Sequence, residues 1–287
     1  MKKRTGMIAF IFIILFCTIW VAVLTEYVRE HAFLLKVTAD YCEGSMFRAH
    51  TVEKDCLLEL KNQAEAADID FYEYLAAAFL IEKGSLSDQK AVLGHQALYR
   101  ELLPDLKKND GFTAVTDSMR AVWNDLTYFP IPASVKNEDA EISFENSWLF
   151  ERSFGGTRGH EGCDIMASLN RRGYYPVISM TDGTVEKIGW LPQGGYRIGI
   201  RAKSGAYFYY AHLYEYATHF KEGTQITAGQ LLGYMGDSGY GEEGTIGKFD
   251  VHLHIGIYIK TEKNDEVSIN PYYVLQYLEK KKLNYSY

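Results

Sequence analysis

The stretch that decides the fold is VHLHIGIYI, residues 251–259. Every second residue in it is apolar, as in a strand with one face in a core, because successive strand side chains point to opposite faces. His252 and His254 then project together from the other face. Two imidazoles fixed on one rigid strand suit metal binding, because little ordering entropy remains to be lost. A pair of surface histidines on a half-exposed strand is the other interpretation, and this stretch alone does not separate the two.

Short stretches with strand character lie on the N-terminal side of residues 251–259, and turn pairs such as Asp-Gly, Gly-Gly and Ser-Gly separate them. These stretches are residues 183–188, 197–201, 207–210 and 231–235. Strands at this spacing predict an antiparallel β domain. Near the C-terminus, Asn270 as N-cap and Pro271 at the first helical position predict a helix over residues 272–282.

The sequence before residue 128 has the spacing of apolar residues that is typical of helices rather than of strands. Alanine-rich segments with recurring apolar positions predict helices within residues 26–109, and a further helix is expected over residues 111–126. Pro130 and Pro132 end the helical pattern and mark a domain boundary. The histidines of this region are isolated in sequence, so we expect solvated or core side chains rather than metal ligands. They are His31, His50 and His95.

Residues 7–24 form an uncharged run of 18 residues. Roughly 18–20 apolar residues in a helix cross the hydrocarbon core of a membrane. Basic residues at positions 2–4 precede the run, so the positive-inside rule keeps the N-terminus in the cytoplasm and sends the rest outside. A cleaved signal peptide is the alternative, but its apolar stretch is usually about 7–15 residues and an Ala-x-Ala site would follow. Bulky Phe16 before Cys17 argues against a lipoprotein signal. We therefore expect an uncleaved anchor.

The predicted architecture is α+β and has four parts. They are a cytoplasmic tail (1–6), a transmembrane helix (7–24), an extracytoplasmic helical region (25–130) and a mostly antiparallel β domain with a C-terminal helix (131–287). A net charge of -7 gives no electrostatic footprint for a nucleic-acid partner. Cys42 and Cys56 would lie on the oxidising side, where they pair only if the chain breaks its helix near Gly44, and this is left open.

Two more segments carry candidate metal-binding or catalytic side chains. In RGHEGCD, residues 158–164, a glycine-rich loop offers His160 and Asp164, and both can reach one ion. Zinc accepts imidazole nitrogen and carboxylate oxygen at about 2.0–2.2 Å. His-x-x-x-Asp is weak evidence by itself because it arises often by chance. His212 ends the aromatic strand 207–210, and taken alone it could be a buried histidine that holds a backbone carbonyl.

In this order, the three segments resemble the lysostaphin/LytM-type family of zinc peptidoglycan endopeptidases, which has a duplicated-hybrid-motif-like β domain. That family's pattern is His-x-x-x-Asp, then a lone histidine at the end of a strand, then His-x-His on a later strand. The resemblance extends to TDGTV (181–185) and GQLLGYMGDSG (229–239). It covers roughly residues 148–259 and leaves out the helical region.

The resemblance implies that His160, Asp164 and His254 are zinc ligands and that His212 and His252 are unliganded catalytic histidines. Three protein ligands leave one tetrahedral position for water, which distinguishes catalytic from structural zinc sites. Zinc would activate that water and polarise the scissile carbonyl. The two histidines could accept the water's proton and hold the developing oxyanion, in an order that the sequence does not assign.

Several neighbours have more than one interpretation. Glu161 is expected to be a solvated loop carboxylate rather than a general base, because no helix holds it. Cys163 as a zinc ligand is awkward beside Asp164. Arg158 could contact a substrate carboxylate or the oxyanion, or form a structural salt bridge. His219 is expected at the surface. Some of the 22 tyrosines could line a groove for an extended peptide, although packing explains them equally well.

Two connections depart from the family pattern: a longer acidic loop at residues 239–251 and an extension at residues 170–176. We expect the first to flank the cleft and to affect which cross-link fits. Neither departure removes a ligand.

The predicted function is a membrane-anchored zinc endopeptidase that cuts peptide cross-links of peptidoglycan outside the cytoplasmic membrane. Its expected partners are peptidoglycan stem peptides, the membrane, and an envelope protein bound through residues 25–130. The alternative is a catalytically silent scaffold or activator of other wall hydrolases, as in sporulation or division complexes. The complete ligand set favours the enzyme. A structural zinc domain fits poorly because no fourth ligand is present.

Overall fold

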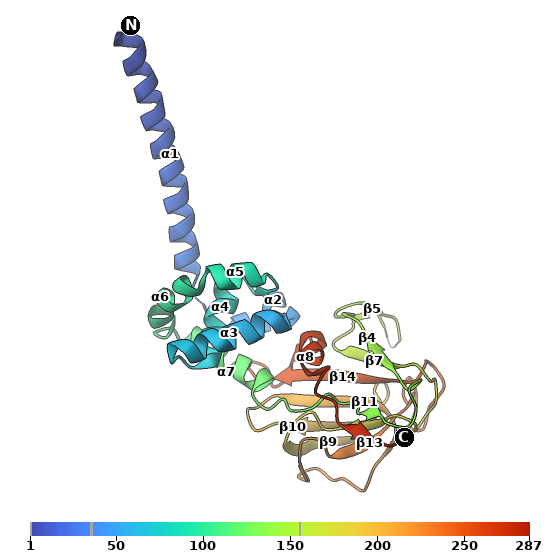
Figure 1. Ribbon diagram of the computed structural model, residues 1–287. Helices are drawn as coiled ribbons and strands as arrows, with labels where there is room; N and C mark the ends of the chain where they lie inside the picture. Colours follow the sequence, from blue (N-terminus) through green and yellow to red (C-terminus); the bar gives the residue numbers. More distant parts are fainter. Residues whose placement is uncertain (1, 35–36, 155) are drawn as a thin grey trace.

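The computed structural model describes residues 2–34, 37–154 and 156–287 (Figure 1). Helix α1, Lys2–Leu34, projects away from the rest of the chain in Figure 1. Among the described residues it is the one helix long and apolar enough to cross a membrane, over Phe10–Val28, a test that a signal sequence also passes. This span overlaps the predicted anchor at residues 7–24. The side chain of His31 lies outside the part of the chain that the structure describes.

Short helices form the region between α1 and the sheet (Figure 1). In chain order they are η1 (Ala39–Glu43), α2 (Ser45–Ala49), α3 (Lys54–Ala67), α4 (Phe71–Ile81), α5 (Gln89–Gly94), α6 (Gln96–Leu106) and α7 (Asp110–Trp123), with a parallel pair of two-residue strands, β1 (Thr51–Val52) and β2 (Ser85–Leu86). Helix α4 is the centre of this region, because its residues 74–80 are all buried. Asp70 and Asp88 accept backbone N–H bonds at the starts of α4 and α5, which fixes where those helices begin.

The histidines and cysteines of the helical region have structural surroundings. His50 is fully buried, and the Trp123 indole donates a 2.8 Å hydrogen bond to its Nε2. His95 is exposed, with Nδ1 2.7 Å from a Glu82 carboxylate oxygen. Cys42 and Cys56 are both buried and free. The sequence left their pairing open, and the structure has two thiols whose pKa burial raises to about 11.

The β domain is built on a ten-stranded antiparallel sheet, counted over the described residues. Its main path is β12-β9-β10-β11-β14-β7-β4, and β13, β8 and β15 pair off this path. The strands are β4 (Ile142–Phe144), β7 (Cys163–Ala167), β8 (Pro176–Ile178), β9 (Gly183–Leu191), β10 (Gly195–Arg201), β11 (Tyr207–Tyr216), β12 (Gln225–Ile226), β13 (Leu231–Met235), β14 (His252–Ile259) and β15 (Val267–Ile269). The predicted fold class is confirmed: an N-terminal apolar helix, a helical region, an antiparallel sheet and a C-terminal helix.

Strand β14 has one face in the core and one face toward solvent. Leu253, Ile255 and Ile257 are fully buried, together with Phe208 and Tyr210 of the neighbouring β11. The alternation in residues 251–259 therefore sorts the side chains as predicted. The histidines of β14 emerge on the opposite face, at the middle of the sheet.

Helix α8, Tyr272–Leu278, ends four residues earlier than the predicted limit of residue 282. The chain after it turns to pair with the segment that enters the β domain. Lys281 accepts a hydrogen bond from Phe129 and Leu283 accepts one from Ala133. Strand β16 (Asn284–Tyr285) then pairs with β3 (Ala133–Ser134) in parallel. These tertiary hydrogen bonds compete with the helical ones, and the helix stops.

Candidate metal centre and cleft

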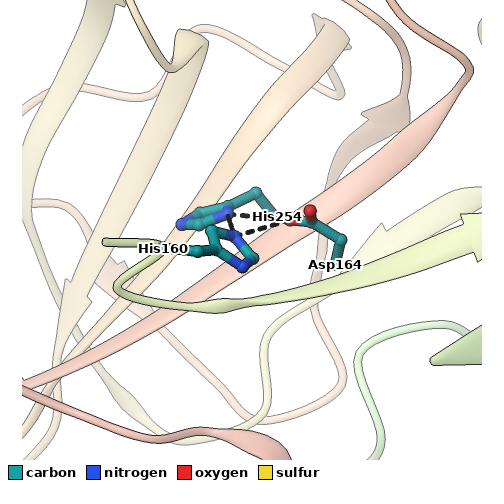
Figure 2. Close-up of side chains that lie close together, drawn as sticks. All are labelled: His160, Asp164 and His254. Atoms are coloured by element: carbon teal, nitrogen blue, oxygen red, sulfur yellow. Dashed lines mark hydrogen bonds and ion pairs between the residues drawn. The ribbon is translucent and has the colours of Figure 1, made fainter. Parts of the chain in front are cut away.

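The register of β7 against β14 places a carboxylate beside an imidazole. Asp164 is paired directly with His254 across the two antiparallel strands. Directly paired residues project on the same side of a sheet, about 4.5–5.5 Å apart at Cβ. His160 follows β6 (Arg158–Gly159) and enters the same space from its loop, as Figure 2 shows. The sequence motifs at residues 160–164 and 252–254 thus meet at one point.

The donor atoms of these three side chains converge. His254 Nδ1 lies 2.9 Å from Asp164 Oδ1, and His160 Nε2 lies 3.1 Å from the same oxygen. The two ring nitrogens are 3.0 Å apart (Figure 2). All three side chains are at least partly buried, and their ligand atoms lie within 4.8 Å of one another.

Glycine at position 162 makes the approach possible. A Cβ there would overlap the His254 ring and the carbonyl oxygen of Ile255. The loop between His160 and Asp164 therefore passes directly against the imidazole, where only glycine fits. In the sequence, Gly162 predicted a loop rather than a helix; in the structure it also makes room for a ligand.

Asp164 is ionised and firmly held. Burial opposes its charge, but hydrogen bonds from His160 and His254 outweigh burial and keep the pKa of this carboxyl far below its usual range. Its second oxygen accepts a 2.8 Å hydrogen bond from Arg152 Nη2. Arg152 lies on β5 (Glu151–Arg152), which pairs with β6 just before His160. The arginine therefore orients the carboxylate while Oδ1 faces the two imidazoles.

His212 reaches this face of the sheet through an unusual backbone. Strand alternation would place it with Phe208 and Tyr210, whose side chains are in the core. Its φ of 62° is in the left-handed region, which only a few per cent of non-glycine residues adopt. The pairing of β11 with β14 ends at Ala211, and β11 then pairs with β13. The irregular residue turns the His212 ring to within 4.7 Å of the His252 ring, measured between centroids.

His212 and His252 have the same kind of partner. His212 Nδ1 lies 2.8 Å from the Ser238 carbonyl oxygen, and His252 Nδ1 lies 2.7 Å from the Asp250 carbonyl oxygen. A carbonyl only accepts, so Nδ1 carries the proton in each ring and Nε2 keeps its lone pair. Burial, helped by the neighbouring His252 and His254, lowers the pKa of His212 well below its ordinary value. His212 is therefore neutral at physiological pH.

The two departures from the family pattern pack against each other. Arg172 forms a two-pronged ion pair with the buried Asp237, two residues before the acidic loop begins. Asn170 donates a 2.8 Å hydrogen bond to Asp250 and accepts one from the backbone of Val251. Asp250 is the residue whose carbonyl holds His252. The extension at residues 170–176 thus braces the loop that orients one of the histidines.

The neighbours of the ligand motif are now placed. Cys163 is buried, and its thiol donates to the Glu145 carbonyl at 3.3 Å, on the face of β7 opposite Asp164. Glu161 forms an ion pair with Arg48 of the helical region, so it is not simply a solvated carboxylate. His219 is exposed, as expected. Arg158 has no salt bridge among the described residues, and its Nε is buried without a hydrogen-bond partner.

The five predicted site residues, His160, Asp164, His212, His252 and His254, line one cleft of about 1030 Å³. One wall of it is aromatic. Phe249 packs against His212 at 4.6 Å and against His252 at 5.0 Å between ring centroids, and Tyr240 packs against Phe249 at 4.8 Å. Phe154, from the β5–β6 hairpin, stacks on Tyr240 at 4.2 Å. The predicted acidic loop therefore does flank the cleft, through its aromatic residues.

The donor set fits zinc. Tetrahedral zinc with bonds of about 2.0–2.2 Å separates its ligand atoms by roughly 3.3 Å. The three donor atoms here are 2.9–3.1 Å apart, close to that spacing. Two imidazoles and one carboxylate are also ligand types that zinc accepts. His252 Nε2, 3.8 Å from Asp164 Oδ1, borders the side that remains open to the cleft.

Three residues of the site were missed by the sequence interpretation. Arg152 has no signal in sequence, because the two-residue strand that positions it is set only by pairing with β6. Arg48 lies 113 positions from Glu161. Asn170 belongs to a connection that had been noted only for its length.

Fold and cleft together define an antiparallel β domain with a candidate metal centre, joined to a helical region. A family model described as Peptidase family M23 matches residues 158–271. The crystal structure of a protein from Ruminococcus gnavus, provisionally named the glycyl-glycine endopeptidase LytM, matches with a TM-score of 0.71 and 45% identity. This match covers 88% of the present chain and 99% of the other. The chain belongs to peptidase family M23, which confirms the resemblance found in the sequence.

Two curated relatives share part of the chain. The L-Ala–D-Glu endopeptidase of Bacillus subtilis is 43% identical over 144 residues, which is 50% of this chain and 41% of that protein. The glycyl-glycine endopeptidase ALE-1 of Staphylococcus capitis is 30% identical over 115 residues, which is 36% of this chain and 30% of that protein. The chain thus spans less than half the length of either. By contrast, the match to the Ruminococcus structure covers 88% of the chain and so includes the helical region.

Proposed function

We propose that this chain is a membrane-anchored zinc endopeptidase that hydrolyses peptide cross-links of bacterial peptidoglycan. Membership of family M23 and relatives named as endopeptidases support the reaction class. In this proposal residues 7–24 anchor the chain in the cytoplasmic membrane, residues 25–130 form an extracytoplasmic helical region, and residues 131–287 form the peptidase domain. The tail at residues 1–6 is cytoplasmic. The apolar helix near the N-terminus supports the anchor.

The observation on which the proposal rests is the convergence of five side chains from three distant segments. His160, Asp164 and His254 would hold the zinc ion. Bound there, zinc would supply Lewis-acid chemistry, activating water and polarising the scissile carbonyl. Arg152 keeps the carboxylate in place, and Gly162 gives the His254 ring its space.

His212 and His252 would move the proton. Each ring is oriented by a carbonyl at Nδ1 and presents Nε2 to the cleft. A neutral imidazole in this tautomer accepts a proton from the attacking water, and the resulting imidazolium can donate to the oxyanion or to the leaving amine. The ring centroids are 4.7 Å apart, so both rings can face the same reacting group. Phe249 packs against both rings and helps to hold them in place.

The test is metal analysis and digestion with the full chain in detergent micelles. We expect one zinc per chain and release of defined muropeptides from purified peptidoglycan, lost with a chelator and restored by zinc. His254→Ala should abolish both metal binding and cleavage, with a loss of at least about a thousandfold in rate. His219→Ala, at an exposed histidine outside the cleft, is the matched control and should change neither.

Two results would contradict the proposal. Full zinc content in the His254→Ala variant would show that His254 is not a zinc ligand. A wild-type chain that holds zinc and releases no peptide would favour the silent scaffold instead. The masses of the released muropeptides also identify the bond that this chain cuts. The two curated relatives are named for different bonds, L-Ala–D-Glu in one case and Gly–Gly in the other.

A further inference from the structure

The floor of the cleft beyond the histidines is made of three tyrosines. Tyr207, Tyr209 and Tyr258 lie on the same face of β11 and β14, with ring centroids 6.0–6.4 Å apart. This group of three rings adjoins the metal cluster, because the Tyr209 ring is 6.0 Å from the His254 ring. Burial raises the pKa of all three phenols, that of Tyr207 to about 12, so they stay neutral.

Glycines allow these rings to lie flat against the sheet. A Cβ at Gly199 would overlap the Tyr207 ring, and one at Gly194 would overlap the Tyr209 hydroxyl. A Cβ at Gly256 would come within 2.8 Å of the Tyr258 ring. A glycine inside or beside a strand often marks a place where another group lies close against the backbone. The floor is therefore a built surface beside the metal cluster.

Two arginines flank this floor and lack partners. Arg158 Nε and Arg197 Nη1 are buried atoms with no hydrogen-bond acceptor among the described residues. Both guanidinium groups line the cleft. Arg197 lies close enough to Tyr207 and Tyr209 to lower the pKa of both phenols, and Arg158 does the same for Tyr258. In each case burial has the larger, opposite effect.

The other cations of the cleft are already paired. Arg152 is held by Asp164, and Lys187 lies 3.6 Å from Glu222. Four acids line the cleft: Asp164 belongs to the metal cluster, Asp250 accepts a hydrogen bond from Asn170, and Glu161 is paired with Arg48. Glu266 is the remaining acid. It raises the pKa of Tyr207 and Tyr258, so it lies near the tyrosine end of the cleft. Two guanidinium groups against one free acid leave this end positive.

On the basis of the proposed function, we infer that this end of the cleft is a carboxylate-binding subsite for an acidic residue of the peptide substrate. A buried N–H without an acceptor is costly, and a planar carboxylate satisfies a guanidinium group in two-pronged geometry. The neutral tyrosine hydroxyls add donors without adding charge. Among the described residues that line the cleft, the wall with Phe249 and Tyr240 has no cation beside these two rings, so the acidic residue lies on the side of the scissile bond that faces Arg158 and Arg197.

The inference separates the two bonds named in the relatives. A Gly–Gly bridge offers no side-chain carboxylate near the reacting bond, whereas an L-Ala–D-Glu bond has an acidic residue next to it. The subsite therefore favours stem peptides that carry a free carboxylate on the acidic residue over the same peptides in which that carboxylate is an amide.

The experiment compares two synthetic stem peptides that differ only in this group, a carboxylate or a primary carboxamide, on the full chain in micelles with zinc. We expect the wild type to prefer the carboxylate peptide by about 10- to 100-fold in kcat/KM. Arg158→Gln and Arg197→Gln should each reduce this ratio, and the double variant should bring it close to one. Zinc content and circular dichroism spectra that match the wild type show that the variants are folded. Arg171→Gln, at an exposed arginine that does not line the cleft, should keep the full preference.

Binding provides a second measurement that does not depend on turnover. Calorimetry with both peptides N-methylated at the scissile amide should give the same preference as a ratio of Kd values. If the wild type cleaves peptidoglycan but treats both peptides alike in rate and in Kd, the subsite is wrong and the proposed function stands. If it cleaves nothing but binds the carboxylate peptide in an arginine-dependent way, the proposed function fails and the subsite stands. A double variant that keeps the preference overturns the inference.

Discussion

His50 in the helical region and His212 beside the cleft have similar backbones and similar burial. Both have a left-handed φ, 47° and 62°, and both are under 10% exposed. Burial lowers the pKa of each. They differ in what their ring nitrogens meet: the Trp123 indole donates to Nε2 of His50, whereas Nε2 of His212 faces the cleft.

This difference shows which feature marks a functional histidine in this protein. Burial, a strained backbone and a lowered pKa are present at both positions, so none of them identifies a site. A lone pair that the fold orients but does not use is present only at His212 of the two.

The largest expected effect comes from making one substitution at both histidines. Asparagine tolerates the left-handed backbone, so His212→Asn and His50→Asn remove the imidazole without adding backbone strain. We expect His212→Asn to lower kcat/KM by about 10²- to 10⁴-fold, because the proton acceptor is lost. Its zinc content and its free energy of unfolding should stay close to wild type. Peptide hydrolysis, metal analysis and urea unfolding measure the three quantities.

His50→Asn should have the opposite effect. Loss of a buried ring and of the acceptor for Trp123 should lower the free energy of unfolding by about 2–4 kcal/mol. Activity per folded molecule should remain within about twofold. If His212→Asn keeps full activity, or if His50→Asn loses activity while folded, the distinction between the two histidines does not hold.

The second effect is a pH dependence of stability that comes from His50. Burial lowers its pKa from the ordinary 6.5 to about 4 in the folded state. Between these pH values the unfolded chain binds a proton that the folded chain does not, so stability rises with pH. The contribution is fully present above about pH 6.5 and is lost as the pH falls toward 4, for a total of about 3 kcal/mol.

Urea unfolding of wild type and His50→Asn at a series of pH values tests this. Other titrating groups are common to both proteins, so the difference in free energy isolates His50. We expect the advantage of the wild type to shrink by about 3 kcal/mol between pH 7 and pH 4. A constant difference across this range would mean that His50 is not held neutral by its surroundings.

The comparison also shows where sequence was sufficient. The alternation in residues 251–259 predicted both the core face and the site face of β14, because side-chain direction in a regular strand follows from position alone. The same rule applied to β11 places His212 in the core. Only the left-handed residue, and the change of partner from β14 to β13, turn it toward the cleft, and both depend on tertiary pairing.

Arg152 and the end of α8 were unpredictable for a related reason. Arg152 meets Asp164 because two-residue strands pair, and propensity has little influence over so short an element. Helix α8 stops at Leu278 because the following chain bonds to residues 129–135. The direction of side chains along a regular strand follows from sequence alone, whereas contacts set by distant backbone pairing do not.

The smallest expected effect lies where the two regions meet. Arg48 of α2 forms an ion pair with Glu161, the residue after His160, and donates to Ser268 of β15 at 2.6 Å. Asn270 strengthens the same junction by donating its backbone N–H to the Arg48 carbonyl at 2.8 Å. The Arg48 side chain is 27% exposed and that of Glu161 is 47% exposed, so solvent screens the pair. A double-mutant cycle with Arg48→Met and Glu161→Gln should therefore give a coupling in unfolding of no more than about 1 kcal/mol.

Zinc affinity is the more informative measurement for this pair. Glu161 adjoins a candidate ligand, so releasing it frees the loop that presents His160, and we expect zinc affinity to fall by up to about tenfold in competition with a chelator. Arg120→Met is the matched control, because Arg120 pairs with Asp70 inside the helical region at similar exposure and does not reach the sheet. If both variants lower zinc affinity equally, the loss comes from general loosening of the helical region. If neither does, Arg48 joins the two regions without influencing the metal centre.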